Sequence, residues 1–249
     1  ELVTPVQQAK PERVLQQNGI TAWLYPSQQF ASQPRGVLEI FINTPAPQQD
    51  IKARVALALW RDIFSLQQSV LSTEADIAGM QLRLTAGSGM ALTVAGFTDK
   101  QPELLQQALA GLVVSTDEQS FAQAKDRYIR GLQNQGKQFP FYQAFNGYNT
   151  LVRNGNYEPE QLITAANSLT IAQLQSFIAD TLANNQLRVF AFGNYDKAAI
   201  AQVVAAVQQA LPAQRNEQPY SRTAYWQPAA GEKLVLQKDI DVADVGLVD

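Results

Sequence analysis

The strongest constraint on the fold comes from two alternating runs that are joined by a tight turn. Residues 81–85 and 90–97 each place apolar and polar side chains at alternate positions, as a strand with one buried face does. The turn between these runs carries Gly87 and Gly89, and glycine is the residue that hairpin turns favour most. The sequence therefore predicts a β-hairpin over residues 81–97 and an antiparallel part of a sheet.

Further strands and helices alternate irregularly along the chain. Strand-like apolar patterns occupy residues 19–25, 37–42 and 186–192. Apolar residues at helical spacing predict helices over residues 50–66, 101–113 and 196–211. Two capping boxes, Thr116 with Gln119 and Thr170 with Gln173, predict the starts of two more helices. This order of elements predicts an α+β domain, in which helices pack on one face of a mostly antiparallel sheet.

The predicted domain covers residues 1–215, and the tail that follows has a different pattern. The stretch from Pro212 to Gly231 is polar and contains prolines, so we expect a linker there. Residues 216–249 are then predicted to be linker and the first strand of a following domain, because apolar residues alternate after Lys233. The chain starts at Glu1 rather than at methionine and stops within this strand-like pattern. We therefore expect a longer parent protein.

The composition removes most ways of building a hydrolytic site. The 249 residues include no Cys, which excludes disulfides, thiolate nucleophiles and thiolate metal ligands. They also include no His, the commonest metal ligand and the commonest general base near neutral pH. The sequence therefore predicts no catalytic, no cofactor-binding and no metal-binding residue in this chain.

Charge and hydropathy argue against two classes of partner. The net charge is −3, and Lys and Arg are scattered singly rather than gathered into a basic patch, so we expect no nucleic-acid binding. No apolar stretch approaches the ~20 residues that span a bilayer, so we expect no membrane span. A hydrophobic content of 46% is instead typical of a globular protein with a full core.

Two short segments allow a functional interpretation beside a structural one. Residues 87–89 (GSG) would fit a phosphate-binding loop, but no Lys-Ser/Thr pair follows them, and a hairpin turn is the favoured interpretation. Glu74 and Asp76 would form a carboxylate pair for a cation. We interpret these two residues as the polar end of a helix instead.

A Ser-Lys dyad and an aromatic cluster also stay open. Ser115 or Ser120 would pair with Lys125 as nucleophile and base, although chance gives equally plausible spacings elsewhere. The aromatic cluster consists of Phe139, Phe141, Tyr142, Phe145 and Tyr148. These side chains would line a substrate chamber or pack in the core. Core packing is the favoured interpretation, because aromatic rings bury a large area wherever they can.

Several motifs together resemble the pitrilysin and insulin-degrading-enzyme family of zinc metallopeptidases. Residues 72–79 (STEADIAG) are similar to the alanine-rich end of a helix in the third domain of that family. Residues 94–105 (VAGFTDKQPELL) are similar to the corner that follows the hairpin of the same domain. The first strand, with Phe30 and Pro34 after it, matches as well. The resemblance covers roughly residues 10–215.

The resemblance implies a function for a longer parent. Enzymes of this family consist of four repeated α+β domains, and the first domain holds zinc through an H-x-x-E-H motif on a helix. The matching helix here, residues 53–60 (ARVALALW), has neither His nor Glu, so no zinc ligand transfers. The implied function is that of a non-catalytic third domain of a pitrilysin-like zinc metalloendopeptidase that degrades peptides. The domain would form part of the chamber that encloses the substrate.

The implied cofactor is zinc in the first domain of the parent, with none in this chain. The implied partners are the other domains of the parent and its peptide substrate, and the implied compartment is periplasmic or secreted. Two other functions stay open. An inactive homologue would serve as a binding or assembly subunit, which a parent without H-x-x-E-H would favour. An independent enzyme that uses Ser, Lys or carboxylates would need activity of the chain without metal.

Overall fold

The computed structural model describes residues 10–26, 33–211, 214–215, 224–233, 235 and 237. The strands are β1 (Glu12–Gln17), β2 (Ile20–Pro26), β3 (Arg35–Asn43), β4 (Gln81–Ala86), β5 (Gly89–Phe97), β6 (Asn184–Gly193) and β7 (Gln214–Arg215). They form one sheet in the order β1-β2-β6-β3-β5-β4, with β7 beside β6. Strand β6 runs parallel to β2 and to β7, and every other neighbouring pair is antiparallel. The predicted mostly antiparallel sheet is therefore confirmed.

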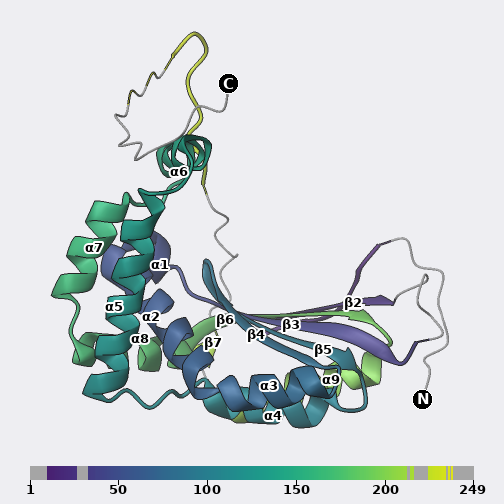
Figure 1. The fold of residues 1–249 in the computed structure, drawn as a ribbon. Helices are drawn as coiled ribbons and strands as arrows, with labels where there is room; N and C mark the ends of the chain where they lie inside the picture. Colours follow the sequence, from purple (N-terminus) through teal and green to yellow (C-terminus); the bar gives the residue numbers. More distant parts are fainter. Residues whose placement is uncertain are drawn as a thin grey trace, which may run out of the picture.

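Nine helices connect these strands within the described residues. They are α1 (Ala46–Gln49), α2 (Ile51–Gln67), α3 (Ser69–Ile77), α4 (Gln101–Gly111), α5 (Glu118–Gln135), α6 (Pro140–Val152), α7 (Pro159–Ser168), α8 (Ile171–Ala183) and α9 (Lys197–Ala210). The helices that pack on the sheet lie on one side of it, as predicted (Figure 1). Helix α6 stands apart from this layer, beyond the ends of α5 and α7 (Figure 1).

Local caps fix where several helices begin. The Asp50 carboxylate accepts hydrogen bonds from the backbone N–H groups of Lys52 and Ala53 at the start of α2. The predicted capping box of Thr170 and Gln173 is present at α8. The box predicted at Thr116 is wrong by one residue. There Asp117 caps α5 instead, because its carboxylate accepts from the backbone N–H of Ser120 at 2.6 Å.

The core lies between the helices and one face of the sheet. Its strand residues, all buried, are Ile20, Ala22, Leu24, Leu38, Ile40, Ile42, Leu82, Leu84, Met90, Leu92, Val94, Leu187, Val189 and Ala191. Helix α2 supplies the largest buried side chain, Trp60. Its indole N–H donates to the carbonyl oxygen of Leu112 at 2.9 Å, and its ring meets the edge of Phe177. Trp60 thus joins α2 to α8 and to the chain that leaves α4.

One further sequence prediction is wrong, and another falls largely outside the described residues. The aromatic cluster is not in the core: all five side chains are more than half exposed, because they lie on or just before the outlying helix α6. Within the stretch that is predicted as a linker, β7 pairs with β6, and the linker itself stays a prediction. The strand predicted after Lys233 lies mostly outside the described residues.

Candidate functional site

The face of the sheet that points away from the core carries a cluster of aromatic rings. We call this surface the open sheet face. Its central residues are Thr21, Trp23 and Tyr25 of β2, Arg188, Phe190 and Phe192 of β6, Val37, Glu39 and Phe41 of β3, and Ala91, Thr93 and Ala95 of β5. These side chains alternate with the core residues, because successive residues of a strand point to opposite faces. In the part of the chain that the structure describes, no helix covers this face (Figure 1).

Strand register gathers the rings into one patch. In the parallel pair of β2 and β6, Trp23 is the partner of Phe190, and Tyr25 is the partner of Phe192. The rings of Tyr25 and Phe192 are 5.6 Å apart between centroids. On the other side of β6, Phe190 faces Glu39. The patch therefore offers apolar rings beside a carboxylate, and all of these side chains are half-buried.

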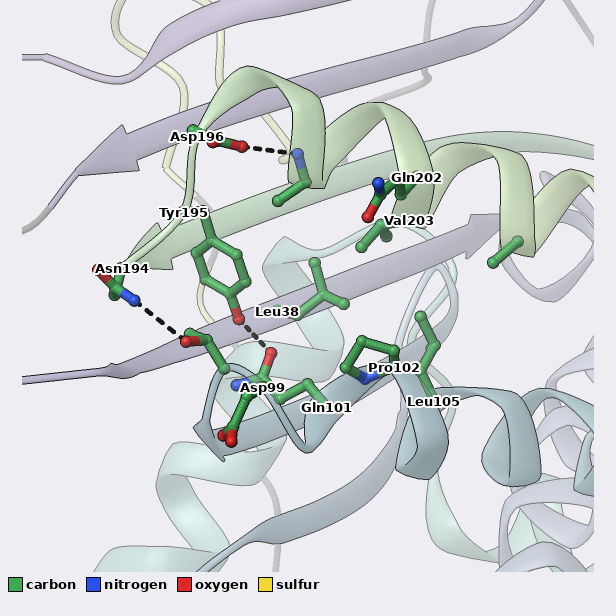
Figure 2. Close-up of a pocket in the computed structure, with 13 residues that line it drawn as sticks. Leu38, Asp99, Gln101, Pro102, Leu105, Asn194, Tyr195, Asp196, Gln202 and Val203 are labelled. Atoms are coloured by element: carbon green, nitrogen blue, oxygen red, sulfur yellow. Dashed lines mark hydrogen bonds between the residues drawn. The ribbon is translucent and has the colours of Figure 1, made fainter. Parts of the chain in front are cut away.

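A cavity lies on the helical side of the sheet, between α4 and α9. This cavity has a volume of about 710 Å³. Its apolar lining comes from Leu38, Pro102, Leu105, Ala199, Val203 and Ala206. Figure 2 shows Tyr195 reaching from the start of α9 towards Gln101 at the start of α4. The two elements are thus joined by a buried phenol-to-amide hydrogen bond.

Two buried polar side chains beside this cavity, those of Gln101 and Tyr195, are hydrogen-bonded to each other. The Gln101 amide donates to the carbonyl oxygens of Gly36 at 2.8 Å and of Gly96 at 3.3 Å, and its own oxygen accepts from the Tyr195 hydroxyl. Burial raises the pKa of the Tyr195 phenol, so the group stays a neutral donor at any physiological pH. Gly36 is required here, because a β-carbon at this position would collide with the Tyr195 ring. The cluster therefore has a structural role.

The structure gives the residues of the candidate Ser-Lys dyad other partners. The Lys125 ammonium donates to the carbonyl oxygens of Asn167 at 2.9 Å and of Leu169 at 3.2 Å, at the end of α7. The Ser120 hydroxyl donates to the Asp117 carboxylate at 3.1 Å. The backbone of Ser115 is held by the side chain of Gln67. Burial lowers the pKa of Lys125, but its contacts are those of a cation at a helix C-terminus.

The other candidate groups also have structural positions. Residues 87–89 form the hairpin turn, as predicted, in which the N–H of Gly87 donates to the carbonyl oxygen of Gly89 at 2.8 Å. Glu74 and Asp76 lie in the last turn of α3, in agreement with their interpretation as the polar end of a helix. They are two residues apart, and side chains at this spacing do not face each other on a helix.

The described residues could not hold a zinc ion like the one that the family resemblance implies for the first domain of the parent. Six of the eight positions on α2 that match the zinc-binding helix are buried, namely Ala53, Val55, Ala56, Leu57, Leu59 and Trp60. Within the described residues, no group of three or more His, Cys, Asp or Glu side chains could hold a metal ion. A catalytic zinc needs three protein ligands, so we derive no step through zinc in this chain.

The family model for the middle or third domain of peptidase M16 matches residues 2–165. The chain belongs to the M16 peptidase family. This match confirms the family that the sequence motifs indicated. It also identifies the chain as the middle domain of a larger, multi-domain type of peptidase.

Named relatives agree with this assignment. The chain is 23% identical over 208 residues to Protease 3 of Shigella flexneri, an alignment that covers 83% of this chain and 22% of that protein. It is 26% identical over 174 residues to human insulin-degrading enzyme, which covers 69% of this chain and 16% of that protein. The chain therefore spans about a fifth of the length of these M16 relatives.

Solved structures share the fold. The crystal structure of pitrilysin matches with a TM-score of 0.80 at 22% identity, over 86% of this chain and 23% of that chain. The peptidase M16 inactive domain from Pseudomonas fluorescens matches with a TM-score of 0.62 at 16% identity, over 88% of this chain and 54% of that chain. Among the described residues of this M16 domain, no helix is both long and apolar enough to cross a membrane.

The open sheet face and the exposure of α6 are the features that sequence reasoning missed. A signal for the open sheet face was present, because aromatic residues alternate with core residues in β2 and β6. No comparable signal existed for α6, because its aromatic content equally fits burial.

Proposed function

We propose that this chain is a non-catalytic middle domain of a pitrilysin-like zinc metalloendopeptidase that degrades peptides. In this proposal the open sheet face forms part of the wall of a chamber that encloses the substrate. The zinc and the reacting groups belong to another domain of the whole protein, the first. We further propose that the domain covers residues 1–215, and that the whole protein works in the periplasm or outside the cell.

One observation carries the proposal: a half-buried aromatic patch covers the sheet where no described helix packs. Trp23, Phe190 and Glu39 are neighbours there through strand register. Aromatic rings bind peptide side chains through apolar area, and a carboxylate beside them adds a polar contact. The chain has no His and no Cys, so binding and enclosure are the contributions that this surface can make.

A second candidate function is that of a binding or assembly subunit without peptidase activity. The structural similarity to the peptidase M16 inactive domain from Pseudomonas fluorescens favours this candidate. The two functions differ in what the rest of the protein contains. A whole protein without an H-x-x-E-H sequence would support the assembly subunit.

We expect the purified chain to leave peptides intact, with or without added zinc. The chain has no His to hold the metal or to act as a general base. The whole protein is expected to degrade the same peptides and to lose this activity in the presence of a chelator. The measurement is the release of fragments, followed by mass spectrometry. Cleavage by the isolated chain would contradict the proposal.

Replacing Phe190 by serine in the whole protein tests whether the open sheet face forms part of the wall of the substrate chamber. The substitution removes apolar contact area from the centre of the open sheet face, so we expect KM to rise about tenfold with little change in kcat. Ile77→Ser is the matched control, because this side chain is 83% exposed on α3, on the helical side of the sheet. Equal KM values for the two variants would count against the chamber wall, provided that both unfold at the wild-type temperature.

A further inference from the structure

Helix α6 presents an exposed aromatic surface that the proposed function does not use. The aromatic face of α6 consists of Phe139, Phe141, Tyr142, Phe145 and Tyr148, which are between 54% and 72% exposed. Phe141, Phe145 and Tyr148 recur at positions i, i+4 and i+7, so their side chains lie along one stripe of the helix. The rings of Phe141 and Phe145 stack at 6.4 Å.

The area of this face is large enough for a specific interface. Rings of this size bury about 150–250 Å² each, so these five leave roughly 600 Å² of mostly apolar surface in water. The smallest biological interfaces take about 500 Å² from each partner. An apolar patch of this size lies at the upper end of what a monomeric protein exposes, and such patches are often contact sites.

The composition of the helix points to an apolar protein surface as the partner. No charged residue occurs from residue 138 to residue 152. Polar side chains turn back onto the chain: the amide of Gln143 donates to the carbonyl oxygens of Gly136 and Gln138, and that of Asn149 donates to the carbonyl oxygen of Phe145. The aromatic rings therefore make up most of the surface that α6 exposes to solvent. Aromatic enrichment with a depletion of charge is typical of the buried centre of an interface.

The path of the chain brings the downstream polypeptide to this helix. The N–H of Asn154 donates to the carbonyl oxygen of Ala224 at 2.9 Å, and the N–H of Trp226 donates to that of Val152 at 2.8 Å. The Arg153 guanidinium lies 5.4 Å from the centre of the Tyr225 ring. Figure 1 shows this stretch passing beside α6, far from the sheet. Residues 224–226 are thus attached to the C-terminal end of α6.

Because residues 224–226 are attached to α6, the polypeptide that follows them has a high local concentration at the aromatic face of α6. Helix α6 has 13 residues, so it is only about 20 Å long. A chain that leaves from Trp226 covers that distance with about six extended residues. Tethered over so short a span, an apolar surface of the downstream polypeptide meets the rings at an effective concentration in the millimolar range.

We propose that the aromatic face of α6 is the docking surface for an apolar face of the polypeptide that follows this domain in the same protein. This inference rests on the proposed function only in requiring that the domain belongs to a larger protein. It assigns α6 to the contact between domains and leaves peptide binding to the open sheet face.

Hydroxyl-radical labelling tests the docking on the whole protein and on residues 1–249 alone, with a reporter peptide in both samples to calibrate the radical dose. We expect Phe141, Phe145 and Tyr148 to be oxidised several times more slowly in the whole protein. Equal rates would overturn the proposal. Protection that grows with the concentration of the isolated chain would assign the face to a second copy, and protection that needs added peptide would assign it to substrate. Either result would also overturn the proposal.

A double substitution in the whole protein gives the second test. Phe141→Ser with Phe145→Ser is expected to raise the oxidation rate of Tyr148 to its value in the isolated chain, whereas Val70→Ser leaves it unchanged. Val70 is a matched control because it is 68% exposed on α3, within the helical layer. All three replaced side chains are exposed, so the melting temperature of residues 1–249 should not change. Continued protection of Tyr148 in the double variant would overturn the docking.

The docking and the proposed function can fail separately. A whole protein that never degrades peptides would refute the peptidase function, and the oxidation rates would still decide whether α6 is covered. Full peptide degradation by the double variant, with Tyr148 exposed, would support docking and would show that chamber formation does not need it.

Discussion

Replacing Trp60 by alanine is expected to lower the free energy of unfolding by about 4 kcal/mol, the largest effect of any single change considered for this M16 domain. The Trp60 side chain is fully buried, and its ring packs edge-on against Phe177 of α8. Its removal opens a cavity where α2, α8 and the end of α4 meet. It also leaves the carbonyl oxygen of Leu112 without the indole donor.

Denaturant unfolding of the purified chain measures this loss. Trp60→Phe is the matched control, because it keeps most of the apolar volume and removes only the N–H donor. We expect this variant to lose about 1–2 kcal/mol. The slope of the free energy against denaturant should be the same for all three proteins, so that the shift of the midpoint measures the change in stability. A loss below 1 kcal/mol for Trp60→Ala would mean that the neighbouring helices close the cavity.

Replacing Gln101 by leucine is expected to cost about 3 kcal/mol of unfolding free energy. Gln101 is 2% exposed, and its amide donates to the carbonyl oxygens of Gly36 and Gly96. Leucine fills a similar volume but removes these donors and the acceptor for the Tyr195 hydroxyl. Buried polar groups that lose their partners account for most of the expected cost.

Tyr195→Phe separates the contributions of this cluster. It removes one hydroxyl and leaves the Gln101 amide on both carbonyl oxygens, so we expect a loss of about 1 kcal/mol. The same chemical denaturation measures both variants. If Tyr195→Phe were as destabilising as Gln101→Leu, the phenol-to-amide bond would be the dominant contact, and the bonds to the two strands would contribute little.

The elements that the sequence predicted correctly are those with a local signal. The hairpin over residues 81–97, the cap at Asp50 and the box at Thr170 each need only nearby residues to be recognised. Strand β1 was missed because it is a mostly polar edge strand without a fully buried side chain. Periodicity gave no signal for helix α3, whose end only the family resemblance indicated, because Ala75 is its one buried residue and it has no apolar stripe.

The features that sequence reasoning missed depend on distant parts of the chain. The strand that carries Phe190 lies between β2 and β3, and no local pattern indicates that position. The large rings of Phe141 and Phe145 can be recognised in the sequence. Whether these rings are buried depends on the position of α6 relative to the rest of the domain. Gln101 was noticed as part of a family motif, whereas its contact with Tyr195 joins residues 94 positions apart. Pattern analysis therefore predicted the elements better than it predicted the surfaces they form together.

The insertion of β6 between β2 and β3 has a consequence for synthesis on the ribosome. Strands β2 and β3 are synthesised early. The strand that lies between them in the sheet, β6 (Asn184–Gly193), emerges about 140 residues after β3. Until then β2 and β3 each keep an unsatisfied backbone edge, which attracts other strands. Pairing over so long a sequence separation is also slow. A nascent chain that ends before about residue 190 in the numbering of this domain should therefore depend on chaperones that shield strand edges.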